Sequence, residues 1–529
     1  MDNTLAYEIN RRRTFAIISH PDAGKTTLTE KLLLYGGAIR LAGSVKARRA
    51  DRHAVSDWMD IEKQRGISVT SSVMAFDYSG FRINILDTPG HQDFSEDTYR
   101  TLVAADSAVM LIDAAKGVEQ QTIKLFHVCS KRNIPIFTFV NKLDRAGKPP
   151  FELMEELESV LGIRCCPINW PIGTDGDFKG VYHRDKALVE LYSGGNHGKT
   201  KVDSVSGKVD DPVFKELLGE YHYNKLCEDI ELLDAAGDHF NIEKVLAGQL
   251  TPMFFGSAMN NFGVESFLEK FLEFTTPPSP RESNIGITPT ISDNFSGFIF
   301  KIQANMNPAH RDRIAFMRIC SGKFTKGMSV QHVNANKEIK LAQPQQFMAQ
   351  EREMIEEAYA GDIIGLFDPG IFKLGDTLCT GERLEYAGIP LFAPEHFSRI
   401  RPMDTMKRKQ FIKGILQLSE EGALQTFREP DVSSEELIIG VVGVLQFEVL
   451  EHRLRSEYNV EIKSQTLPFK FVRWIVNKDT DPSSLKLSSS ARIALDNKAR
   501  AVLLFENEWS MRWAVDNNKG LELSDIAER

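Results

Sequence analysis

Short apolar runs recur along roughly the first 280 residues of the chain. They occupy residues 14–18, 81–86, 109–112, 135–140 and 252–255. Each run is followed by a polar or glycine-containing loop, and then usually by a stretch of helical character. This alternation predicts a mostly parallel sheet covered by helices on both faces. In such sheets ligands bind at the carboxyl ends of the strands.

Residues from about 160 to 250 interrupt this rhythm. Glycine and serine give residues 194–195 and 204–207 a loop-like composition, whereas residues 211–233 have a helical pattern. We interpret the interruption as a subdomain inserted into the first domain.

A proline-rich segment at residues 277–280 marks the next boundary, because proline cannot continue a helix. Between about residues 290 and 385, short strand-like runs separated by turn signals predict a small β-barrel. Beyond residue 390 the pattern mixes helical residues 403–421 with strand-like residues 437–442, which indicates an α+β module.

A chain of 529 residues is too long for one hydrophobic core, which agrees with several domains. Its hydrophobic fraction of 42% and charged fraction of 26% are those of a globular protein. No run of eighteen apolar residues predicts a membrane span, and the polar N-terminus lacks the apolar stretch of a secretory signal. We therefore expect a cytoplasmic protein. The net charge of −9 argues against a general nucleic-acid binder, but not against local docking on RNA.

The six cysteines show no CxxC spacing. Adjacent Cys165 and Cys166 are poorly placed to bridge each other or to chelate zinc together. We expect reduced, buried thiols.

The first candidate for chemistry follows the apolar run at residues 14–18. It is a phosphate-binding loop made of Ser19, His20, Pro21, Asp22, Ala23, Gly24, Lys25 and Thr26. Its backbone N–H groups would wrap the β-phosphate at the N-terminus of the next helix. Lys25 would contact the β- and γ-phosphates, and the Thr26 hydroxyl would ligate Mg²⁺. Ser19 stands where such loops usually have their first glycine.

The second candidate follows the run at residues 81–86 and consists of Asp87, Thr88, Pro89, Gly90 and His91. Asp87 can hold Mg²⁺ through water, and the Gly90 N–H can approach the γ-phosphate closely. Loss of that phosphate would release the following segment. The His91 imidazole can orient the attacking water.

The third candidate, Asn141, Lys142, Leu143 and Asp144, follows the run at residues 135–140. Asp144 can accept two hydrogen bonds from guanine, which adenine cannot supply. Asn141 would tie the loop to its neighbours, and the Lys142 stem would pack against the base. A fourth, weaker signal is the turn containing Ser257 and Ala258, whose backbone N–H groups could reach the guanine O6.

Between the first two candidates lies the sequence QRGIS at residues 64–68. The Ser68 hydroxyl could reach Mg²⁺ when GTP is bound and release it afterwards. Residues 46–53, rich in arginine and lysine, are either a solvated loop or a switch segment that contacts RNA phosphates.

The order SHPDAGKT, RGIS, DTPGH, NKLD and GSA resembles that of the translational GTPases, a family that includes elongation factors Tu and G. Further stretches look like the bacterial class II, or GTPase, peptide chain release factors: residues 15–27, 56–59, 93–102, 300–306, 310–313 and 443–447. The resemblance runs from about residue 10 to 475 and leaves the last ~50 residues without a match.

The resemblance implies an α/β P-loop GTPase domain with an inserted subdomain, then a β-barrel domain and an α+β C-terminal domain. We place these domains at residues 1–281, with the insertion at about 160–250, and at residues 282–388 and 389–529. In this family the histidine equivalent to His91 positions water, and Ser68 replaces the usual threonine of the first switch. Asp22 matches a position that supports a monovalent ion near the phosphates.

The implied activity is ribosome-dependent GTP hydrolysis in translation termination, with GTP or GDP and Mg²⁺ as cofactors. GTP binding would favour a ribosome state from which the codon-reading class I release factor dissociates and is recycled. The partners would be ribosomal RNA, including the sarcin–ricin RNA, ribosomal proteins and class I release factors, with no membrane or DNA. We expect a monomer.

Three alternatives remain at this stage. An elongation-factor-G-like or other translational GTPase would share the long interval between Asp144 and Ser257, but 529 residues are few for the transfer-RNA-mimicking domains of elongation factor G. A GTP-binding scaffold without hydrolysis would have no need of His91. An ATPase or kinase conflicts with Asp144.

Overall fold

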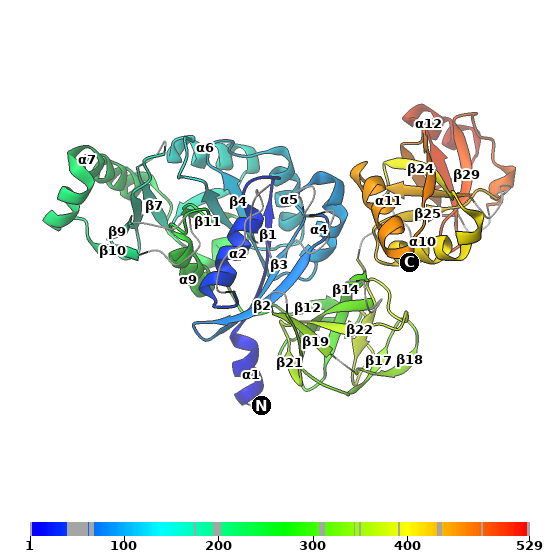
Figure 1. Ribbon diagram of the computed structural model, residues 1–529, viewed down its shortest axis with the longest axis horizontal. Helices are drawn as coiled ribbons and strands as arrows, with labels where there is room; N and C mark the ends of the chain where they lie inside the picture. Colours follow the sequence, from blue (N-terminus) through cyan, green and yellow to red (C-terminus); the bar gives the residue numbers. More distant parts are fainter. Residues whose placement is uncertain are drawn as a thin grey trace.

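The computed structural model describes residues 3–39, 62, 68–173, 176–193, 203–305, 313–342, 344–348, 351–389, 392–430, 436–477 and 480–525. It contains an α/β domain with a lateral extension, a β-rich domain below it and a C-terminal domain beside both (Figure 1). Within the described residues, no helix combines the length and apolarity needed to cross a membrane.

A seven-stranded sheet forms the centre of the first domain, in the order β2-β3-β1-β4-β5-β11-β6. The strands are β1 (Arg12–Ser19), β2 (Ser72–Tyr78), β3 (Phe81–Asp87), β4 (Ser107–Asp113), β5 (Ile136–Asn141), β6 (Arg164–Pro167) and β11 (Leu250–Phe255). All neighbours are parallel except β2 and β3. The predicted α/β sheet is confirmed, and every predicted strand lies in it.

Two helical layers cover this sheet, and the side chains of β1 point alternately into one layer and the other. Phe15 and Ile17 pack in the cluster that includes residues of α2 (Lys25–Tyr35) and α9 (Val264–Phe274). Ala16 and Ile18 belong to the opposite cluster, with residues of α4 (Ser95–Leu102), α5 (Gln120–Lys131) and α6 (Pro150–Leu161). Because successive side chains of a strand point to opposite faces, one apolar run serves both layers.

The insertion has its own antiparallel sheet, in the order β10-β9-β8-β7. Its elements are β7 (Asn169–Ile172), β8 (Gly180–His183), β9 (Leu188–Ser193), β10 (Asp203–Lys208), α7 (Pro212–Ala236) and α8 (Ile242–Leu246). The loop interpretation of residues 204–207 is wrong, because these residues pair with β9 along their whole length. Strand β6 pairs with β11, so residues 164–167 extend the main sheet.

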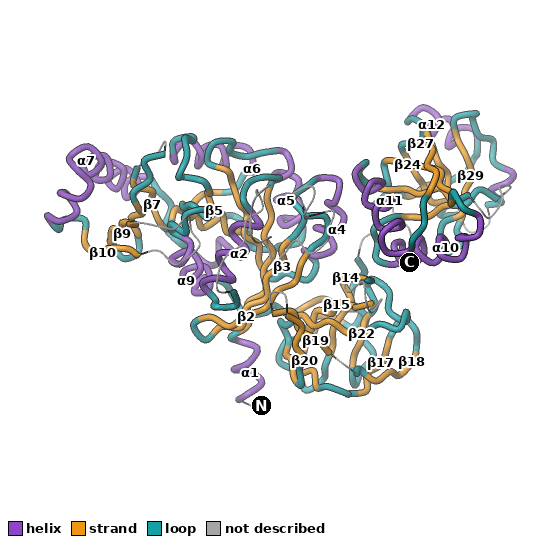
Figure 2. Tube along the Cα trace, viewed as in Figure 1, coloured by secondary structure: helices purple, strands orange, loops and turns teal. Residues whose placement is uncertain are grey.

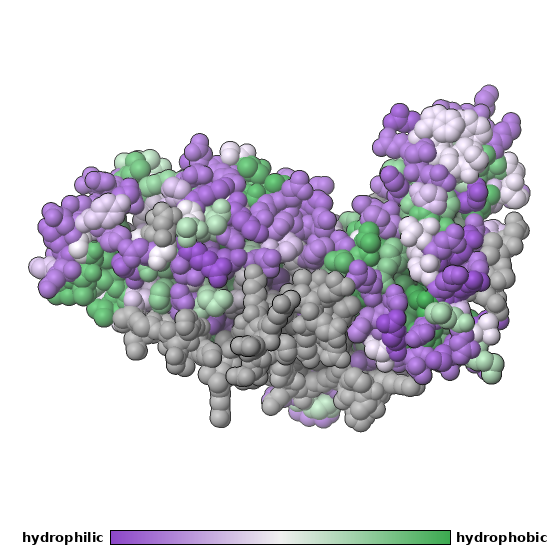
Figure 3. Space-filling model, turned by 45° about the horizontal axis from the view of Figure 1, so that its top comes forward, coloured by the Kyte–Doolittle hydropathy of each residue, from purple (hydrophilic) through white to green (hydrophobic). Residues whose placement is uncertain are grey.

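The surface in Figure 3 shows apolar residues gathered at the end of the molecule formed by the insertion. Exposed side chains on α7 include Val213, Leu217, Tyr221 and Leu232.

The second domain is a β-barrel-like structure, as predicted. Its main sheet has eight strands in the order β18-β17-β23-β14-β15-β22-β19-β20, and β16 and β21 form a separate pair. The strands are β14 (Ser296–Ala304), β15 (Arg313–Ser321), β16 (Lys323–Thr325), β17 (Ser329–His332), β18 (Lys337–Lys340), β19 (Pro344–Met348), β20 (Glu351–Met354), β21 (Glu357–Tyr359), β22 (Ile363–Phe367) and β23 (Thr377–Cys379). The short hairpin of β12 (Arg281–Ser283) and β13 (Gly286–Thr288) precedes them.

The C-terminal domain is α+β, as predicted, and contains two four-stranded sheets (Figure 2). The first contains β24 (His396–Pro402), β25 (Gln425–Phe427), β26 (Leu437–Val441) and β27 (Ile462–Leu467), with helices α10 (Arg408–Glu420) and α11 (Leu445–Tyr458). The second contains β28 (Phe471–Ile475), β29 (Ala491–Leu495), β30 (Ala501–Phe505) and β31 (Leu523–Ser524), with α12 (Glu508–Asn517). The last ~50 residues are therefore an integral part of this domain.

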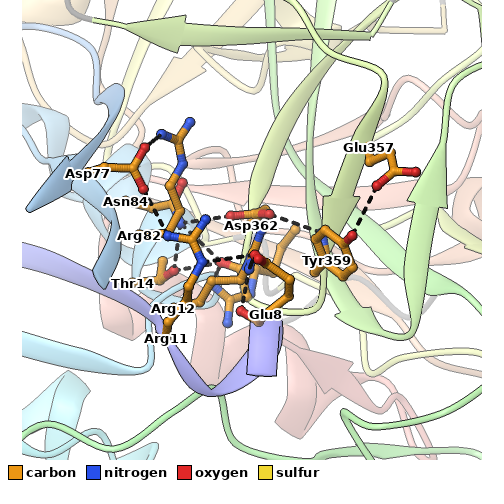
Figure 4. A network of polar contacts seen from close by, with 12 residues as sticks. Glu8, Arg11, Arg12, Thr14, Asp77, Arg82, Asn84, Glu357, Tyr359 and Asp362 are labelled. Atoms are coloured by element: carbon orange, nitrogen blue, oxygen red, sulfur yellow. Dashed lines mark hydrogen bonds and ion pairs between the residues drawn. The ribbon is translucent and has the colours of Figure 1, made fainter. Parts of the chain in front are cut away.

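A polar network joins the α/β domain to the barrel (Figure 4). Arg12 forms a buried ion pair with Asp362, with Nε and Oδ2 2.7 Å apart. The Thr14 hydroxyl donates to the carbonyl of Gly361 at 2.6 Å. On the other side, Arg12 also contacts Glu8 of α1 (Asn3–Asn10). The network fixes the barrel against the start of β1, at the end of the strand opposite the predicted nucleotide site.

Candidate active site

The phosphate-binding loop connects the end of β1, at Ser19, to the start of α2, at Lys25. Asp22 and Gly24 both have left-handed backbone conformations, with φ of 65° and 99°. Such alternation turns successive N–H groups toward one concave space, and the first amides of α2 have no acceptor within the helix. The local backbone therefore suits an anion at this point.

Asn141 connects this loop to two other predicted motifs. Its Nδ2 donates to the carbonyl of Ala23 at 2.8 Å, and its Oδ1 accepts from the Ala258 amide at 2.8 Å. A Cβ added to Gly24 would lie only 2.4 Å from Asn141 Nδ2. The close approach explains why glycine is needed at position 24 and brings three segments together at the carboxyl ends of β1, β5 and β11.

The residues after Asn141 continue this connection. The Lys142 ammonium donates to the Asp22 carbonyl at 2.5 Å and to Asp113 Oδ2 at 2.7 Å. Leu143 is buried. Asp144 Oδ1 accepts a 2.5 Å hydrogen bond from Ser257 Oγ. This hydroxyl orients the carboxylate that is predicted to read guanine.

The end of β3 lies beside the phosphate loop. Lys25 Nζ forms an ion pair with Asp87 Oδ1, and both side chains are buried. The Thr88 hydroxyl donates to the Ile17 carbonyl at 2.8 Å, and the Pro89 carbonyl accepts from Thr98. These bonds fix the start of the DTPGH segment against β1 and α4.

Gly90 reaches the phosphate loop directly. A Cβ placed at Gly90 would lie 3.4 Å from Pro21 Cα and 3.8 Å from the His20 carbonyl carbon. His20 itself contacts Glu119 through Nε2 at 3.3 Å. The backbone at Gly90 is therefore a neighbour of the loop predicted to hold the phosphates.

The residues present fit a magnesium ion. Asp87 Oδ2 is buried without a hydrogen-bond partner, although Oδ1 is paired with Lys25. The Thr26 side chain stands one residue into α2, where P-loop proteins place a hydroxyl ligand. Carboxylate and hydroxyl oxygens are the donors that Mg²⁺ prefers. Within the described residues, no cluster of three or more histidine, cysteine, aspartate or glutamate side chains forms a further metal site.

Ser68 is described, but residues 64–67 of the QRGIS motif and the basic residues 46–53 lie outside the described residues. Ser68 precedes by four positions the start of β2, where Ser72 is in register with Asp87. The register therefore brings the Ser68 segment toward the edge of the sheet that carries the predicted magnesium ligands.

His91 is partly exposed, with a side-chain accessibility of 30%. Its Nδ1 accepts a 3.3 Å hydrogen bond from the Asp93 amide. A neutral ring that accepts through Nδ1 carries its proton on Nε2. In this tautomer Nε2 is the nitrogen that can donate to a water molecule.

Sequence reasoning missed a charged cluster behind this site. Ser71 donates through both its amide and hydroxyl to Asp97 Oδ2, each at 2.6 Å, and buried Lys301 of the barrel donates to the Ser71 carbonyl. Burial alone would raise the pKa of Asp97, but Lys301, Arg100 and the Ser71 hydrogen bonds together lower it below its usual value. No local pattern marks these residues, because their partners come from distant segments.

The cysteines agree with their predicted state except for Cys227, which is only half-buried. All six are free, and five of them are buried. Burial raises the pKa of the Cys129 thiol to about 12, which keeps it protonated.

Three family models match the chain. The model described as "Elongation factor Tu GTP binding domain" covers residues 10–277, and "Elongation factor G domain 2" covers residues 294–381. The model described as "Class II release factor RF3, C-terminal domain" covers residues 386–515. The last match includes much of the segment that the sequence reading left without a resemblance.

Relatives named "Peptide chain release factor 3" match over nearly the full length. That of Symbiobacterium thermophilum is 60% identical over 519 residues, which are 98% of each chain. The chain belongs to the peptide chain release factor 3 family. The relative from Gloeobacter violaceus is 53% identical over 525 residues, 99% of each chain. That of Listeria innocua is 53% identical over 528 residues, 99% of this chain and 100% of the other.

Membership of this family of translational GTPases makes the chain a GTPase that acts in translation termination. The scaffold, ATPase and elongation-factor-G-like alternatives are therefore not retained. A crystal structure of a Thermus thermophilus protein has the same fold, with a TM-score of 0.69 and 24% identity over 89% of this chain and 71% of the other.

Proposed function

We propose that the four motifs at the carboxyl ends of the parallel strands form a guanine-nucleotide switch with GTP and Mg²⁺ as its ligands. The observation that carries this proposal is the position of Asn141, which bonds to both Ala23 and Ala258. One side chain thus joins the phosphate loop to the two segments that would hold the base.

In this proposal the amides of residues 19–26 surround the β-phosphate, and Lys25 leaves Asp87 to contact the β- and γ-phosphates. Thr26 and Ser68 would supply hydroxyl ligands to Mg²⁺, and Asp87 would hold it through water. The charge that develops on the phosphates would be neutralised by this ion when it is bound. Thr88 and Pro89 position Gly90, whose backbone N–H points toward the γ-phosphate in this proposal.

Base recognition falls to the segments after β5 and β11. The Asp144 carboxylate, oriented by Ser257, accepts hydrogen bonds from the guanine edge. The Lys142 stem and the Leu143 backbone support the ring from the NKLD side, and the Ser257–Ala258 turn offers amides to O6. Adenine would leave the carboxylate unpaired, which favours GTP over ATP.

Hydrolysis requires a water oriented in line with the γ-phosphate. His91 Nε2, as the donating ring nitrogen, holds that water once the imidazole is turned toward the phosphates. Ribosomal RNA supplies the contact that turns it, which makes hydrolysis dependent on the ribosome. The factor acts in the cytoplasm as a monomer.

The biological consequence is the recycling of class I release factors. The GTP-bound form favours a ribosome state from which the codon-reading factor dissociates after peptide release, and hydrolysis then lets this protein leave. Residues 46–53, which precede Ser68, would contact RNA phosphates.

The direct test is dissociation of a labelled class I release factor from post-release ribosomes. With GTP, the purified protein should accelerate dissociation; with GDP it should not. A non-hydrolysable GTP analogue should support dissociation but leave this protein bound. Equal dissociation with GDP and GTP would contradict the proposal.

A further inference from the structure

The C-terminal domain contacts the segment that carries His91, and none of the roles proposed above uses this contact. Helix α11 lies on the side of the C-terminal domain that faces α4 (Figure 1). Its first residue, Leu445, donates its amide proton to Asp93 Oδ2 at 2.8 Å, across 352 positions of sequence. Asp93 is the middle residue of η1 (Gln92–Phe94), directly after His91.

The approach of the two segments is as close as a backbone permits. A Cβ placed at Gly443 would lie 2.3 Å from the Cα, Cβ and Cγ of Asp93. Two carbon atoms that are not bonded cannot approach so closely. One of the three Asp93 atoms is the backbone Cα, so a rotation of the Asp93 side chain would not relieve the clash. Only glycine at position 443 therefore allows η1 to lie against this turn.

The turn itself is held in one conformation. Gln446 Oε1 accepts from the amides of Val442 and Gly443, each at 2.9 Å. Gln446 Nε2 donates to the Ala423 carbonyl at 3.2 Å. The glutamine thereby ties the start of α11 to the body of the C-terminal domain, so a displacement of that domain displaces the turn.

Asp93 connects this turn to the His91 imidazole. Its amide donates to His91 Nδ1 at 3.3 Å, and its Oδ1 lies 3.5 Å from the same nitrogen. Its Oδ2 is the atom that accepts from Leu445. The orientation of the imidazole thus depends on a backbone segment that the C-terminal domain fixes from outside.

The same turn contacts the other switch segment through an apolar cluster. Phe94 and Val69 are buried, and Leu445 and Val449 pack against them. Val69 directly follows Ser68, the proposed magnesium ligand. Gly443, Leu445 and Val449 therefore contact the neighbours of both groups that respond to the γ-phosphate.

We propose that the contact of Asp93 with Gly443 and the Leu445 amide positions the switch segment for GTP hydrolysis, and that Asp93 and Gly443 are positioning residues that set the His91 imidazole. The inference rests on the proposed role of His91. Because coupling between two sites is reciprocal, a change in the His91 segment on hydrolysis also alters the docking of the C-terminal domain. The contact therefore connects the nucleotide site to the domain that distinguishes this family.

The test compares variants of the full-length protein in GTP hydrolysis at saturating GTP, with ribosomes varied to saturation. The variants are Gly443→Ala, Asp93→Ala, Asp93→Asn, the double variant Gly443→Ala/Asp93→Ala, Val444→Ala and His91→Ala. Affinity for a fluorescent GDP analogue and thermal unfolding report whether each variant is folded. Val444 lies in the same turn with 56% of its surface exposed, which makes it the matched control.

We expect Gly443→Ala and Asp93→Ala to lower kcat at saturating ribosomes at least tenfold, with GDP affinity within twofold of the wild type. Asp93→Asn should stay within threefold, because an amide oxygen still accepts from Leu445. The double variant should fall no further than the lower single variant, and Val444→Ala should match the wild type.

An unchanged kcat for Asp93→Ala, even with more ribosomes needed for half-saturation, would overturn the inference, because the contact would then serve docking alone. So would an equal loss in Asp93→Asn and Asp93→Ala. Asp93→Ala adds no atoms, so it keeps the test decisive if Gly443→Ala does not fold. Wild-type turnover in His91→Ala would instead overturn the proposed function. A low rate in His91→Ala beside normal rates in the Gly443 and Asp93 variants would overturn only this inference.

Discussion

Arg12 and Asp362 form an ion pair of 2.7 Å across the junction of the GTPase domain and the barrel, with side-chain exposures of 5% and 3%. Removing Asp362 leaves the buried Arg12 guanidinium with Glu8 as its remaining ion-pair partner, and breaking a buried pair costs up to about 3–5 kcal/mol. We expect Asp362→Ala to lower the melting temperature and to speed hydrogen exchange in β1 and β22. An exposed pair offers the control: Glu508→Ala, whose partner Arg512 is 76% exposed, should change stability by less than about 1 kcal/mol. Equal effects of the two substitutions would contradict the assigned role of the junction.

Gly24→Ala should abolish tight nucleotide binding without unfolding the protein. The substitution combines a left-handed φ of 99° with a contact of 2.4 Å to Asn141. Together these cost about 3 kcal/mol, or roughly a hundredfold in GDP affinity. Gly248→Ala, at φ of 68° with no atom within 4 Å, carries the backbone strain alone and should leave affinity unchanged. Isothermal titration with GDP measures both.

Asp144→Asn should weaken GDP binding and shift preference toward xanthine nucleotides. The NH₂ group of the asparagine would face the N1–H and 2-amino donors of guanine. Xanthine presents an oxygen in place of the 2-amino group and can accept from this NH₂. Loss of the charged hydrogen bonds corresponds to about 1.5–3 kcal/mol, or roughly 10–100-fold. Competition between GDP and xanthosine diphosphate measures the preference. Retained guanine preference would contradict the pairing, and Asp516→Asn, on exposed α12, should behave as the wild type.

Lys31 gives a prediction for pH. Burial in α2 lowers the pKa of its ammonium group from 10.5 to about 8. Between pH 8 and 10.5 the unfolded chain therefore holds the extra proton, so this group makes the folded state more stable as pH rises through that window. We expect Lys31→Met to lack this rise. The free energy of unfolding of the variant minus that of the wild type should therefore fall from pH 8 to 10.5. Urea unfolding at several pH values measures it; a constant difference would contradict the assignment.

The sequence was informative wherever a local pattern carried the signal. The apolar runs that became β1, β3, β4, β5 and β11 needed no partner to be recognised, because burial on both faces removes polar residues. Strand β10 was missed because its serine and glycine residues have a loop's composition, and it becomes a strand only through pairing with β9.

The site shows the same division. Gly24, Asp87 and Asp144 were predicted from spacing, because a phosphate loop and a base-reading carboxylate each need a fixed short motif. The contacts of Arg12 with Asp362 and of Asp93 with Leu445 span 350 and 352 positions. No spacing rule connects such residues, so only the folded structure reveals how the domains bear on the switch segments.

The decisive measurement for the role of His91 is GTP turnover with and without ribosomes, in the wild type and in His91→Ala. We expect slow turnover by the free wild-type protein, strong stimulation by ribosomes, and a loss of about 10²–10³-fold in the stimulated rate of His91→Ala with GTP binding retained. His127→Ala, which removes an exposed histidine of α5, should keep the full stimulated rate. Stimulated turnover in His91→Ala equal to that of the wild type would show that His91 does not orient the attacking water.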